Sequence, residues 1–207
     1  MAIARRLSPA KTALFTFGTT SVPDGQVGPW AIETFDVTEV EAKFHNLRCD
    51  LAGRRLDRIE PGTYRRLRHA ERGVVMSNTP MEIMTNRQAY RDAHGSVLIN
   101  GLGLGMLLEG LLAKPTVTAV RVIEVDADVI ALTGPHFAAD PRVTIIHADA
   151  DTYTPAKGER FDYVWHDIWD TISEANLAHM TRLARRYGQR TTCQGFWSRE
   201  MIHAYRR

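Results

Sequence analysis

The chain has 207 residues, 44% of them apolar and 24% charged, which is ordinary for a globular protein of one domain, with or without an appendage. It has no apolar run of the ~18 residues that a membrane span needs and no apolar stretch typical of a secretory signal. Its two cysteines fit neither a disulfide framework nor a thiolate metal site, so we expect a cytoplasmic protein without a metal. The composition as a whole excludes fibrous and disordered classes.

The net charge of +2 hides an uneven distribution along the chain. Residues 124–170 hold ten acidic and three basic side chains. By contrast, residues 48–72 hold eight arginines and four acids, and residues 182–207 hold seven arginines and one acid. This pattern suits a cationic ligand in the middle and an anionic partner, such as nucleic acid, at the basic ends. A coding bias is the other interpretation, because the chain has 22 arginines and only four lysines. The basic ends alone therefore give little support to a nucleic-acid partner.

The first half of the chain reads as loops followed by helices. A short strand is expected at residues 14–17, and glycines and prolines interrupt the stretch that follows. Thr38 with Glu41, and Thr79 with Glu82, have the spacing of capping boxes, so helices should begin at both places. The first helix places four apolar side chains on one face, and the second should reach about residue 93. These four apolar residues are Val40, Phe44, Leu47 and Leu51.

From residue 95 onward, short apolar runs alternate with helical segments. Strands are expected at residues 97–99, 117–125, 143–147, 163–166 and 191–196, with helices between them. This alternation predicts an α/β protein with a doubly wound, mostly parallel sheet. We therefore expect residues 96–207 to form a Rossmann-like core and residues 1–95 to form an N-terminal extension of loops or a hairpin with helices.

In such a sheet, ligands bind beyond the carboxyl ends of the strands, so the residues that follow each strand are the candidates for a site. After the first strand come Asn100 and three glycines, Gly101, Gly103 and Gly105. Glycines allow a tight turn and a close approach of a ligand to the backbone. The third glycine stands one position earlier than in the dinucleotide fingerprint, where this chain has Met106. A tight turn without a ligand is the alternative.

Acidic residues follow the next three strands. Glu124 lies 19 residues after Gly105, close to the offset at which a carboxylate accepts hydrogen bonds from ribose hydroxyls. Asp126 is expected to cap the following helix. Asp149 beside the small Ala150 could accept a hydrogen bond from an adenine amine. A polar and aromatic cluster, formed by His166, Asp167, Trp169 and Asp170, follows the fourth strand. These acids could belong to a ligand site, or they could be ordinary loop or helix-cap residues.

Together, these strand ends resemble the class I S-adenosylmethionine-dependent methyltransferase superfamily over about residues 96–170. The spacing of Asp167 and Asp170 also resembles the spermidine-synthase branch. The resemblance implies S-adenosylmethionine as cofactor, bound by the residues of the glycine turn, by Glu124 and Asp126, by Asp149 with Ala150, and by Asp167. The sequence departs from these families in three places. Asn100 stands where many methyltransferases have an acid, and Leu104 stands where the spermidine-synthase turn has one. Only 37 residues follow Asp170, too few for the C-terminal half of the spermidine-synthase branch, so we expect methyl rather than aminopropyl transfer.

For catalysis, Asp167, Asp170 or His166 could hold an amine or hydroxyl acceptor or take its proton. Trp169 could lie against a cationic or planar acceptor. Packing in the core is the alternative for Trp169 and His166. Glu82 and Tyr90 precede the glycine turn in a segment that often covers the cofactor in similar proteins, although the capping box also explains Glu82. A further loop, at residues 62–66, could lie on the acceptor side.

The sequence thus predicts a methyltransferase that acts on a small-molecule acceptor, away from membranes, and it is compatible with a homodimer. Three alternatives remain on the same fold. They are spermidine-synthase-like aminopropyl transfer, methylation of nucleic acid by way of the basic ends, and a binding module without turnover. A nicotinamide-dependent dehydrogenase is less favoured because of Met106 and because hydride-transfer residue pairs are absent.

Overall fold

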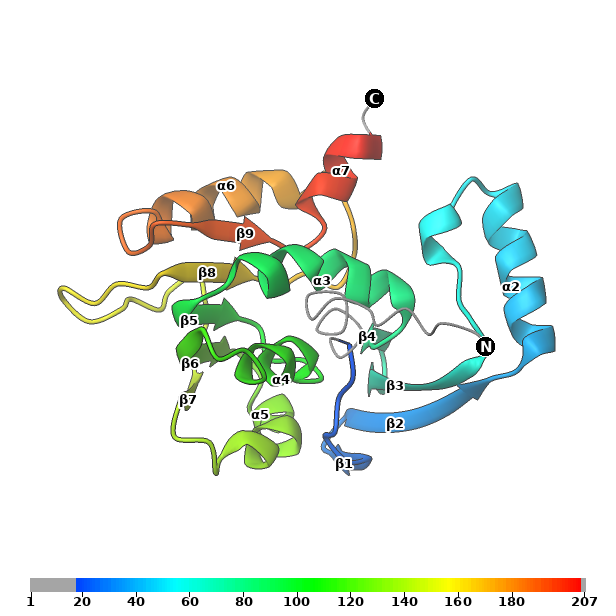
Figure 1. Ribbon diagram of the computed structural model, residues 1–207, viewed down its shortest axis with the longest axis horizontal. Helices are drawn as coiled ribbons and strands as arrows, with labels where there is room; N and C mark the ends of the chain where they lie inside the picture. The colour runs from blue at the N-terminus through cyan, green and yellow to red at the C-terminus, as the bar shows by residue number, and fades with distance from the viewer. Residues whose placement is uncertain (1–17, 206–207) are drawn as a thin grey trace, which may run out of the picture.

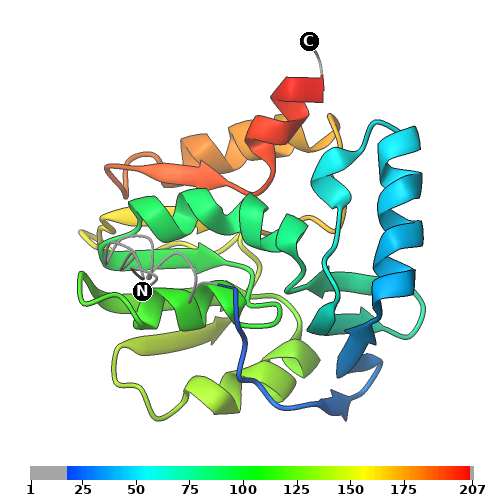
Figure 2. The same ribbon diagram turned by 45° about the vertical axis from the view of Figure 1, so that its right-hand side comes forward.

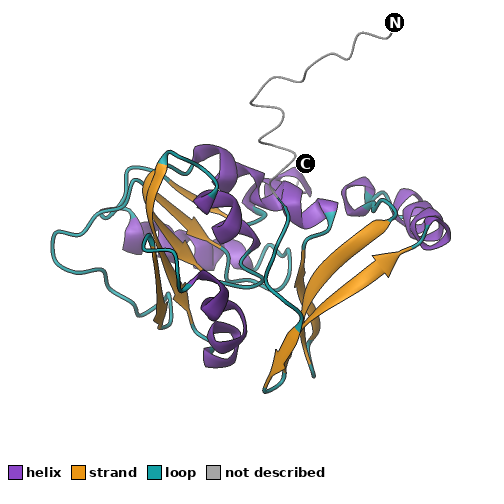
Figure 3. Ribbon diagram, turned by 60° about the horizontal axis from the view of Figure 1, so that its bottom comes forward, coloured by secondary structure: helices purple, strands orange, loops and turns teal. Residues whose placement is uncertain are grey.

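The computed structural model describes residues 18–205 and contains two β-sheets that lie side by side (Figures 1 and 3). One is a four-stranded antiparallel sheet in the first half of the chain, and the other is a five-stranded parallel sheet in the second half. The strand expected at residues 14–17 lies outside the described residues. None of the helices within residues 18–205 combines the length and apolar character that crossing a membrane would take.

The N-terminal sheet has the order β1-β2-β3-β4. Its long central ribbon pairs β2 with β3 over eight residues each, and Glu33 of β2 lies opposite Arg66 of β3. The carboxylate of Glu33 forms ion pairs with Arg66 (2.8 Å) and Arg68 (3.2 Å) across the two strands. The four strands are β1 (Gly25–Val27), β2 (Trp30–Val37), β3 (Gly62–His69) and β4 (Gly73–Ser77).

This sheet corrects the expectation of a loop at residues 62–66, which are the first part of β3. Strand β3 has the sequence GTYRRLRH, in which only Leu67 is buried. Because arginines stand on both faces of the strand, the alternation of apolar and polar residues that identifies a half-buried strand is missing. This strand is stabilised by pairing with β2 and by cross-strand ion pairs rather than by burial of an apolar face.

Two helices belong to this half of the chain, α2 (Glu39–Leu51) and α3 (Pro80–Asp92), with a short 3₁₀ helix η1 (Arg55–Asp57) between them. The capping box of α2 is confirmed, because Thr38 Oγ1 accepts from the Glu41 amide (3.2 Å) and Glu41 accepts from the Thr38 amide (2.8 Å). The apolar face predicted on α2 does not pack into the protein, since all four of its side chains are exposed. Instead, the helix buries Ala42 and Cys49.

The second half of the chain alternates strands and helices as predicted. The elements are β5 (Gly95–Asn100), α4 (Met106–Leu112), β6 (Val117–Glu124), α5 (Ala127–Thr133), a 3₁₀ helix η2 (Gly134–Phe137), β7 (Val143–His147), β8 (Tyr163–His166), α6 (Asn176–Tyr187), β9 (Gln194–Phe196) and α7 (Arg199–Tyr205). All pairings in this sheet are parallel, and the strand order is β7-β6-β5-β8-β9. The doubly wound Rossmann-like fold is therefore confirmed.

The direction of strand addition changes beside β5. The chain moves outward from β5 through β6 to β7, and then returns to place β8 and β9 on the other side of β5. Helices cover both faces of this sheet (Figures 1 and 2), and each face carries a cluster of buried apolar residues. Val97 and Ile99 pack with α4, whereas Leu98 packs with Met180 and Leu183 of α6. With both faces covered, the open place for a ligand is the carboxyl edge of the strands at this change of direction.

Candidate functional site

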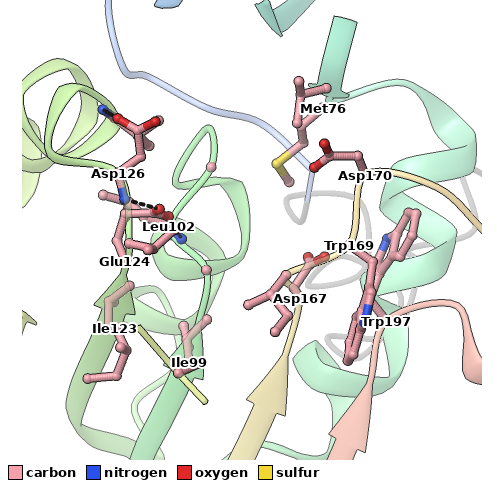
Figure 4. Close-up of a pocket in the computed structure, with 18 of the residues that line it drawn as sticks. Met76, Ile99, Leu102, Ile123, Glu124, Asp126, Asp167, Trp169, Asp170 and Trp197 are labelled. Carbon is pink, nitrogen blue, oxygen red and sulfur yellow. Dashed lines mark hydrogen bonds between the residues drawn. The ribbon is translucent and has the colours of Figure 1, made fainter. Parts of the chain in front are cut away.

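A cavity of about 410 Å³ lies at the carboxyl edge of the parallel sheet (Figure 4). Residues that follow all five parallel strands line it, and the N-terminal sheet closes it from the other side. Its volume is in the range of pockets that bind small organic ligands. The residues that the N-terminal sheet and its turn contribute are Trp30, Leu67, Arg72, Val75 and Met76.

Two of the three predicted glycines line this cavity. Gly101 has φ +103° and Gly103 has φ +51°, backbone conformations that favour glycine. A Cβ atom at Gly101 would overlap the backbone carbonyl oxygen of Asp167, so glycine lets the β5 turn and the end of β8 approach each other. A Cβ atom at Gly103 would lie 2.5 Å from the sulfur of Met76, which covers this part of the turn. Gly105 does not line the cavity and contacts Phe137.

Glu124 lies at the end of β6 with 9% of its surface exposed, and it lines the cavity. One carboxylate oxygen accepts from the amide of Leu102 (2.8 Å) and the other from the amide of Asp126 (2.9 Å). The carboxylate thereby holds the glycine turn against β6, as the dashed lines in Figure 4 show. A carboxylate oxygen has two lone pairs, so each can still accept a hydrogen bond from a ligand hydroxyl.

Asp126 also lines the cavity, but its carboxylate is occupied. One oxygen accepts from the amides of Asp128 (2.9 Å) and Val129 (3.3 Å), which confirms Asp126 as the N-cap of α5. The other oxygen accepts from the indole N–H of Trp30 (2.7 Å) in β2. Asp126 therefore connects the two sheets at the wall of the cavity.

The third strand end places Asp149 and Ala150 at the cavity as predicted. Asp149 is exposed, and its carboxylate accepts from the amide of Asp151 (2.8 Å). Ala150 is buried, and its carbonyl oxygen accepts from the hydroxyl of Tyr187 (2.9 Å). A short side chain at this point leaves room for a flat ring beside the backbone, next to a carboxylate that faces solvent.

Asp167 and Glu82 form a pair of carboxyl groups in the cavity wall. Burial raises the pKa of Asp167 well above its ordinary value, and the nearby charges of Glu82 and Glu124 raise it further. Burial also raises the pKa of Glu82 to about 7, against an opposing effect of hydrogen bonds with Trp197 and Thr85. Two neighbouring carboxyl groups with raised pKa values can retain and exchange a proton at a pH where exposed carboxyl groups are ionised.

The position of Glu82 corrects the second predicted capping box. Thr79 is the N-cap of α3, but its side chain makes no capping hydrogen bond and instead contacts the hydroxyl of Ser77 (2.9 Å). Glu82 is only 7% exposed and lines the cavity. The tertiary structure therefore directs this glutamate away from its own helix terminus and into the site.

The titration of Glu82 predicts a pH-dependent stability. With a pKa near 7 in the folded protein and 4.5 in the unfolded chain, the folded state binds more protons between these pH values, so stability falls as pH rises. Relative to Glu82→Gln, the free energy of unfolding of the wild type should fall by about 2–3 kcal/mol from pH 4.5 to pH 7.5. Urea unfolding of both proteins across this range measures the difference.

Glu41 provides a control of opposite sign. Hydrogen bonds from Thr38 lower the pKa of Glu41, so its contribution to stability is present above pH 4.5 and is lost as pH falls below that value. The Glu41→Gln variant should therefore differ from the wild type in its pH dependence only on the acid side. A constant difference between wild type and Glu82→Gln from pH 4.5 to 7.5 would contradict the buried titration of Glu82.

Asp170 reaches the cavity but is paired. Its carboxylate forms an ion pair with Arg72 (3.1 Å), and both side chains are about half exposed. The guanidinium of Arg72 in turn lies 4.7 Å from the centre of the Trp30 ring. This contact joins the turn between β3 and β4 to the loop after β8 at the mouth of the cavity.

His166 and Asn100 lie beneath the site and do not line the cavity. Asn100 donates to Nδ1 of His166 (2.8 Å), and Nε2 of His166 faces Gln194 Oε1 (3.3 Å), which defines a neutral ring protonated at Nε2. Burial lowers the pKa of His166 to about 4, and the ring stacks on Phe196. The placement corrects the expectation that His166 faces an acceptor and that Asn100 faces the cofactor.

Trp169 lines the cavity and belongs to a row of hydrogen-bonded side chains. Its indole N–H donates to Nδ1 of His179 (3.3 Å), and Nε2 of His179 donates to Asp151 (2.9 Å). Trp197, which directly follows β9, lies across the cavity wall near Trp169 (Figure 4). Tyr90 lies outside this cavity, where its ring contacts the ammonium group of Lys114.

Several lining residues were not predicted. Trp197 could have been found, because it follows the last parallel strand as the other candidates follow theirs. His179 has no such signal, since it reaches the cavity from α6. Trp30, Arg72 and Met76 come from the antiparallel sheet, whose strands lack clear alternation. Among the residues described by the structure, no group of three or more histidine, cysteine or acidic side chains is arranged to hold a metal ion.

No protein-family model matches the sequence. Among solved structures, the chain is similar to the 23S rRNA methyltransferase ErmE, with 18% identity over 55% of this chain and 44% of that chain and a TM-score of 0.43. It is also similar to a putative RNA methyltransferase, PH1948 from Pyrococcus horikoshii, with 14% identity over 61% and 63% of the two chains and a TM-score of 0.44.

A third similar structure is the N-methyltransferase NodS from Bradyrhizobium japonicum in complex with S-adenosyl-l-homocysteine, with 13% identity over 52% of this chain and 57% of that chain and a TM-score of 0.39. In all three comparisons the match covers less than two thirds of the other chain. The names of these three structures are those of methyltransferases, one of them putative.

Proposed function

We propose that this protein is an S-adenosylmethionine-dependent methyltransferase that acts on a small-molecule acceptor. The observation that carries this proposal is the convergence of all five parallel strand ends on one cavity with Glu124 in its wall. Its residues match those that the sequence resemblance assigns to the cofactor, apart from Asn100 and Gly105, which lie outside the cavity.

The residues of the cavity fit this cofactor. Glu124 retains lone pairs for the two ribose hydroxyls while its carboxylate holds the glycine turn. Gly101 and Gly103 allow the methionine part to lie along the backbone, and Asp149 with Ala150 would frame the adenine ring. The acidic lining suits a cationic sulfonium. When bound, this cofactor supplies a methyl group activated for displacement.

The acceptor would lie at the end of the cavity that contains Asp167, Glu82 and the indole rings of Trp169 and Trp197. Either carboxyl group can orient an amine or hydroxyl group and, in its ionised form, accept a proton from it. Burial raises the pKa of both groups and thereby makes each a stronger base than an exposed carboxylate. The indole rings exclude water and offer flat apolar surfaces to a small acceptor. Alignment of the acceptor is the main contribution that a protein makes to such a displacement.

The arginine-rich segments favour a small molecule over nucleic acid. Many of these arginines are engaged within the protein: Arg66 and Arg68 pair with Glu33, and Arg186 donates to the carbonyl oxygen of Tyr153 (2.9 Å). The charges of Glu124, Asp126, Asp149 and Asp151 in the cavity would repel a phosphate backbone, and Arg72 at its mouth is paired with Asp170. Binding of nucleic acid near the site is therefore disfavoured.

Isothermal titration calorimetry with four ligands tests the proposal. S-adenosylmethionine and S-adenosylhomocysteine should bind, whereas NAD should not. A preference for decarboxylated S-adenosylmethionine would replace methyl transfer by aminopropyl transfer, and a preference for NAD would indicate a dehydrogenase. Absence of binding by all four ligands would contradict an enzyme that uses this cofactor.

Removal of the Glu124 carboxylate should weaken cofactor binding. We expect Glu124→Ala to lower the affinity for S-adenosylhomocysteine by roughly 5- to 150-fold, or on the order of 1–3 kcal/mol, through lost charge-assisted hydrogen bonds. Glu124→Gln keeps the size of the side chain and should show a smaller loss. Asp36→Ala, an exposed acid on β2 outside the cavity, serves as the control. An unchanged affinity in a folded Glu124→Ala protein would contradict the assignment.

A further inference from the structure

Helix α2 exposes the apolar face that an amphipathic helix normally buries. The exposed fractions are 62% for Val40, 63% for Phe44, 54% for Leu47 and 81% for Leu51. We refer to these four residues as the α2 stripe. They follow one another at intervals of four, three and four residues, the heptad spacing by which one helix packs against another. The spacing points to a helix as the natural partner of this surface.

The attachment of α2 to the rest of the protein leaves the stripe free. The opposite side of the helix carries the buried Ala42 and Cys49. It also carries two polar anchors to the segment after the helix: His45 Nε2 contacts the carbonyl oxygen of Asp57 (2.8 Å), and Asn46 makes two hydrogen bonds with the backbone of Ile59 (both 2.8 Å). At about 100° of rotation per residue, the stripe points roughly opposite to these contacts.

The position of α2 in the molecule also favours contact with another chain. The helix lies at the far end of the β2–β3 ribbon, away from the parallel sheet, in all three overall views (Figures 1, 2 and 3). No other element of the described residues covers it on the stripe side, as the exposed fractions require. A second molecule can therefore approach the stripe without meeting the cavity.

The charges beside the stripe indicate which kind of helix can pack against it. Glu41 and Arg48 lie on one flank, and Lys43 and Asp50 lie on the other. A twofold axis that passes midway between Phe44 and Leu47 reverses the helix and brings each flank against the same flank of the second copy. Glu41 then lies within about two residues, or ~3 Å along the axis, of Arg48 in the second copy, and Lys43 lies equally close to Asp50.

The same axis also matches the apolar residues. The stripe is symmetric about its midpoint, so Val40 meets Leu51 of the second copy and Phe44 meets Leu47. A parallel arrangement would instead bring opposite flanks together, with Glu41 beside Lys43 and Arg48 beside Asp50 of the second copy. In that arrangement the exchange of charges at positions 43 and 50 would create like-charge contacts, so the register test below separates the two arrangements. Asp50 is also paired with Arg58 in its own chain (2.9 Å), and its position on the flank remains exposed.

We propose that two copies of this chain form a dimer through an antiparallel pairing of their α2 helices. A single pair of short helices buries less area than the ~1,200 Å² of a standard interface. The dimer should therefore be weak and depend on concentration, with a dissociation constant in the micromolar range or above.

Sedimentation velocity over a concentration range of about 1 to 300 µM tests the proposal. The wild type should shift from monomer to dimer, whereas Leu47→Glu and Phe44→Glu should remain monomeric. Val74→Glu is the matched control, because Val74 is 54% exposed on β4 outside the stripe, and this variant should dimerise like the wild type. At about 1 µM, where the wild type should be monomeric, circular dichroism and melting temperature should be unchanged in all three variants, since the substituted side chains are exposed.

The register has its own test. Lys43→Glu places two acids together on one flank and should weaken dimerisation at least tenfold, and the double variant Lys43→Glu/Asp50→Lys should restore it. A wild type that remains monomeric throughout this range would overturn the proposal. Dimerisation of Leu47→Glu would overturn the α2 surface as the interface, and an unaffected Lys43→Glu dimer would overturn the antiparallel register.

Discussion

The Gly101→Ala variant is expected to be about 3–5 kcal/mol less stable than the wild type. Gly101 has φ +103°, a conformation that costs other residues 1–3 kcal/mol. In addition, the new methyl group would overlap the backbone carbonyl oxygen of Asp167, and overpacking typically costs about 1–3 kcal/mol more. Because backbone atoms are involved, no side-chain rotation can relieve the contact. Urea unfolding followed by circular dichroism measures the loss.

The variant should also bind S-adenosylhomocysteine more weakly, because the overlap displaces either the glycine turn or Asp167, which follows β8, and both line the cavity. Gly158→Ala is the matched control. Gly158 also has a positive φ, +82°, but open space surrounds the position of its Cβ atom. It should lose no more than ~2 kcal/mol and no affinity. Equal losses in the two variants would show that backbone strain alone, without the contact to Asp167, accounts for the effect.

The largest effect on activity is expected for Asp167→Asn. If Asp167 accepts the acceptor's proton, its loss should reduce the transfer rate by about 10²–10⁴-fold. Asparagine keeps the shape of the side chain, and the backbone contact at Gly101 is unchanged, so the affinity for S-adenosylhomocysteine should stay within a few-fold of the wild type. The measurement is the rate of S-adenosylhomocysteine release with the first amine or hydroxyl compound that the wild type methylates.

Two comparisons sharpen this experiment. Glu82→Gln should retain more activity at high pH than Asp167→Asn, because removal of the Glu82 charge lowers the pKa of the remaining Asp167 and leaves it able to accept a proton. Asp36→Asn alters an exposed acid outside the cavity and should not change the rate. Full activity of a folded Asp167→Asn protein would show that another group takes the proton or that none is needed.

The proposed site depends on both halves of the chain. The parallel sheet supplies the residues that we propose for the cofactor, and the N-terminal sheet closes the cavity through Met76 above Gly103 and Trp30 beside Asp126. Glu82 and Asp167, from the two halves of the chain, are close enough for the charge of one to raise the pKa of the other. The acceptor end of the cavity is therefore formed where the two halves meet, and changes in the N-terminal sheet should alter acceptor choice more than cofactor binding.

Local sequence signals were sufficient to predict the elements of the second half of the chain and most of the strand-end residues that line the cavity. Apolar runs, capping residues such as Asp126, and the acids that follow strands act through neighbours a few residues away. Glu124 could be placed at the edge of the sheet because it lies at the end of a predicted parallel strand. These features are determined by the sequence itself, because parallel strands bring their carboxyl ends to one edge.

Only the tertiary structure decided where the remaining residues point. Glu82 fits a capping box in sequence, yet packing of α3 over the cavity directs it inward, and His166 is buried because β9 and Asn100 enclose it. Strand β3 forms through pairing with β2 rather than through its own alternation, and the apolar face of α2 stays exposed because a polar attachment holds the opposite face. In each case, contacts between residues distant in sequence override the local preference.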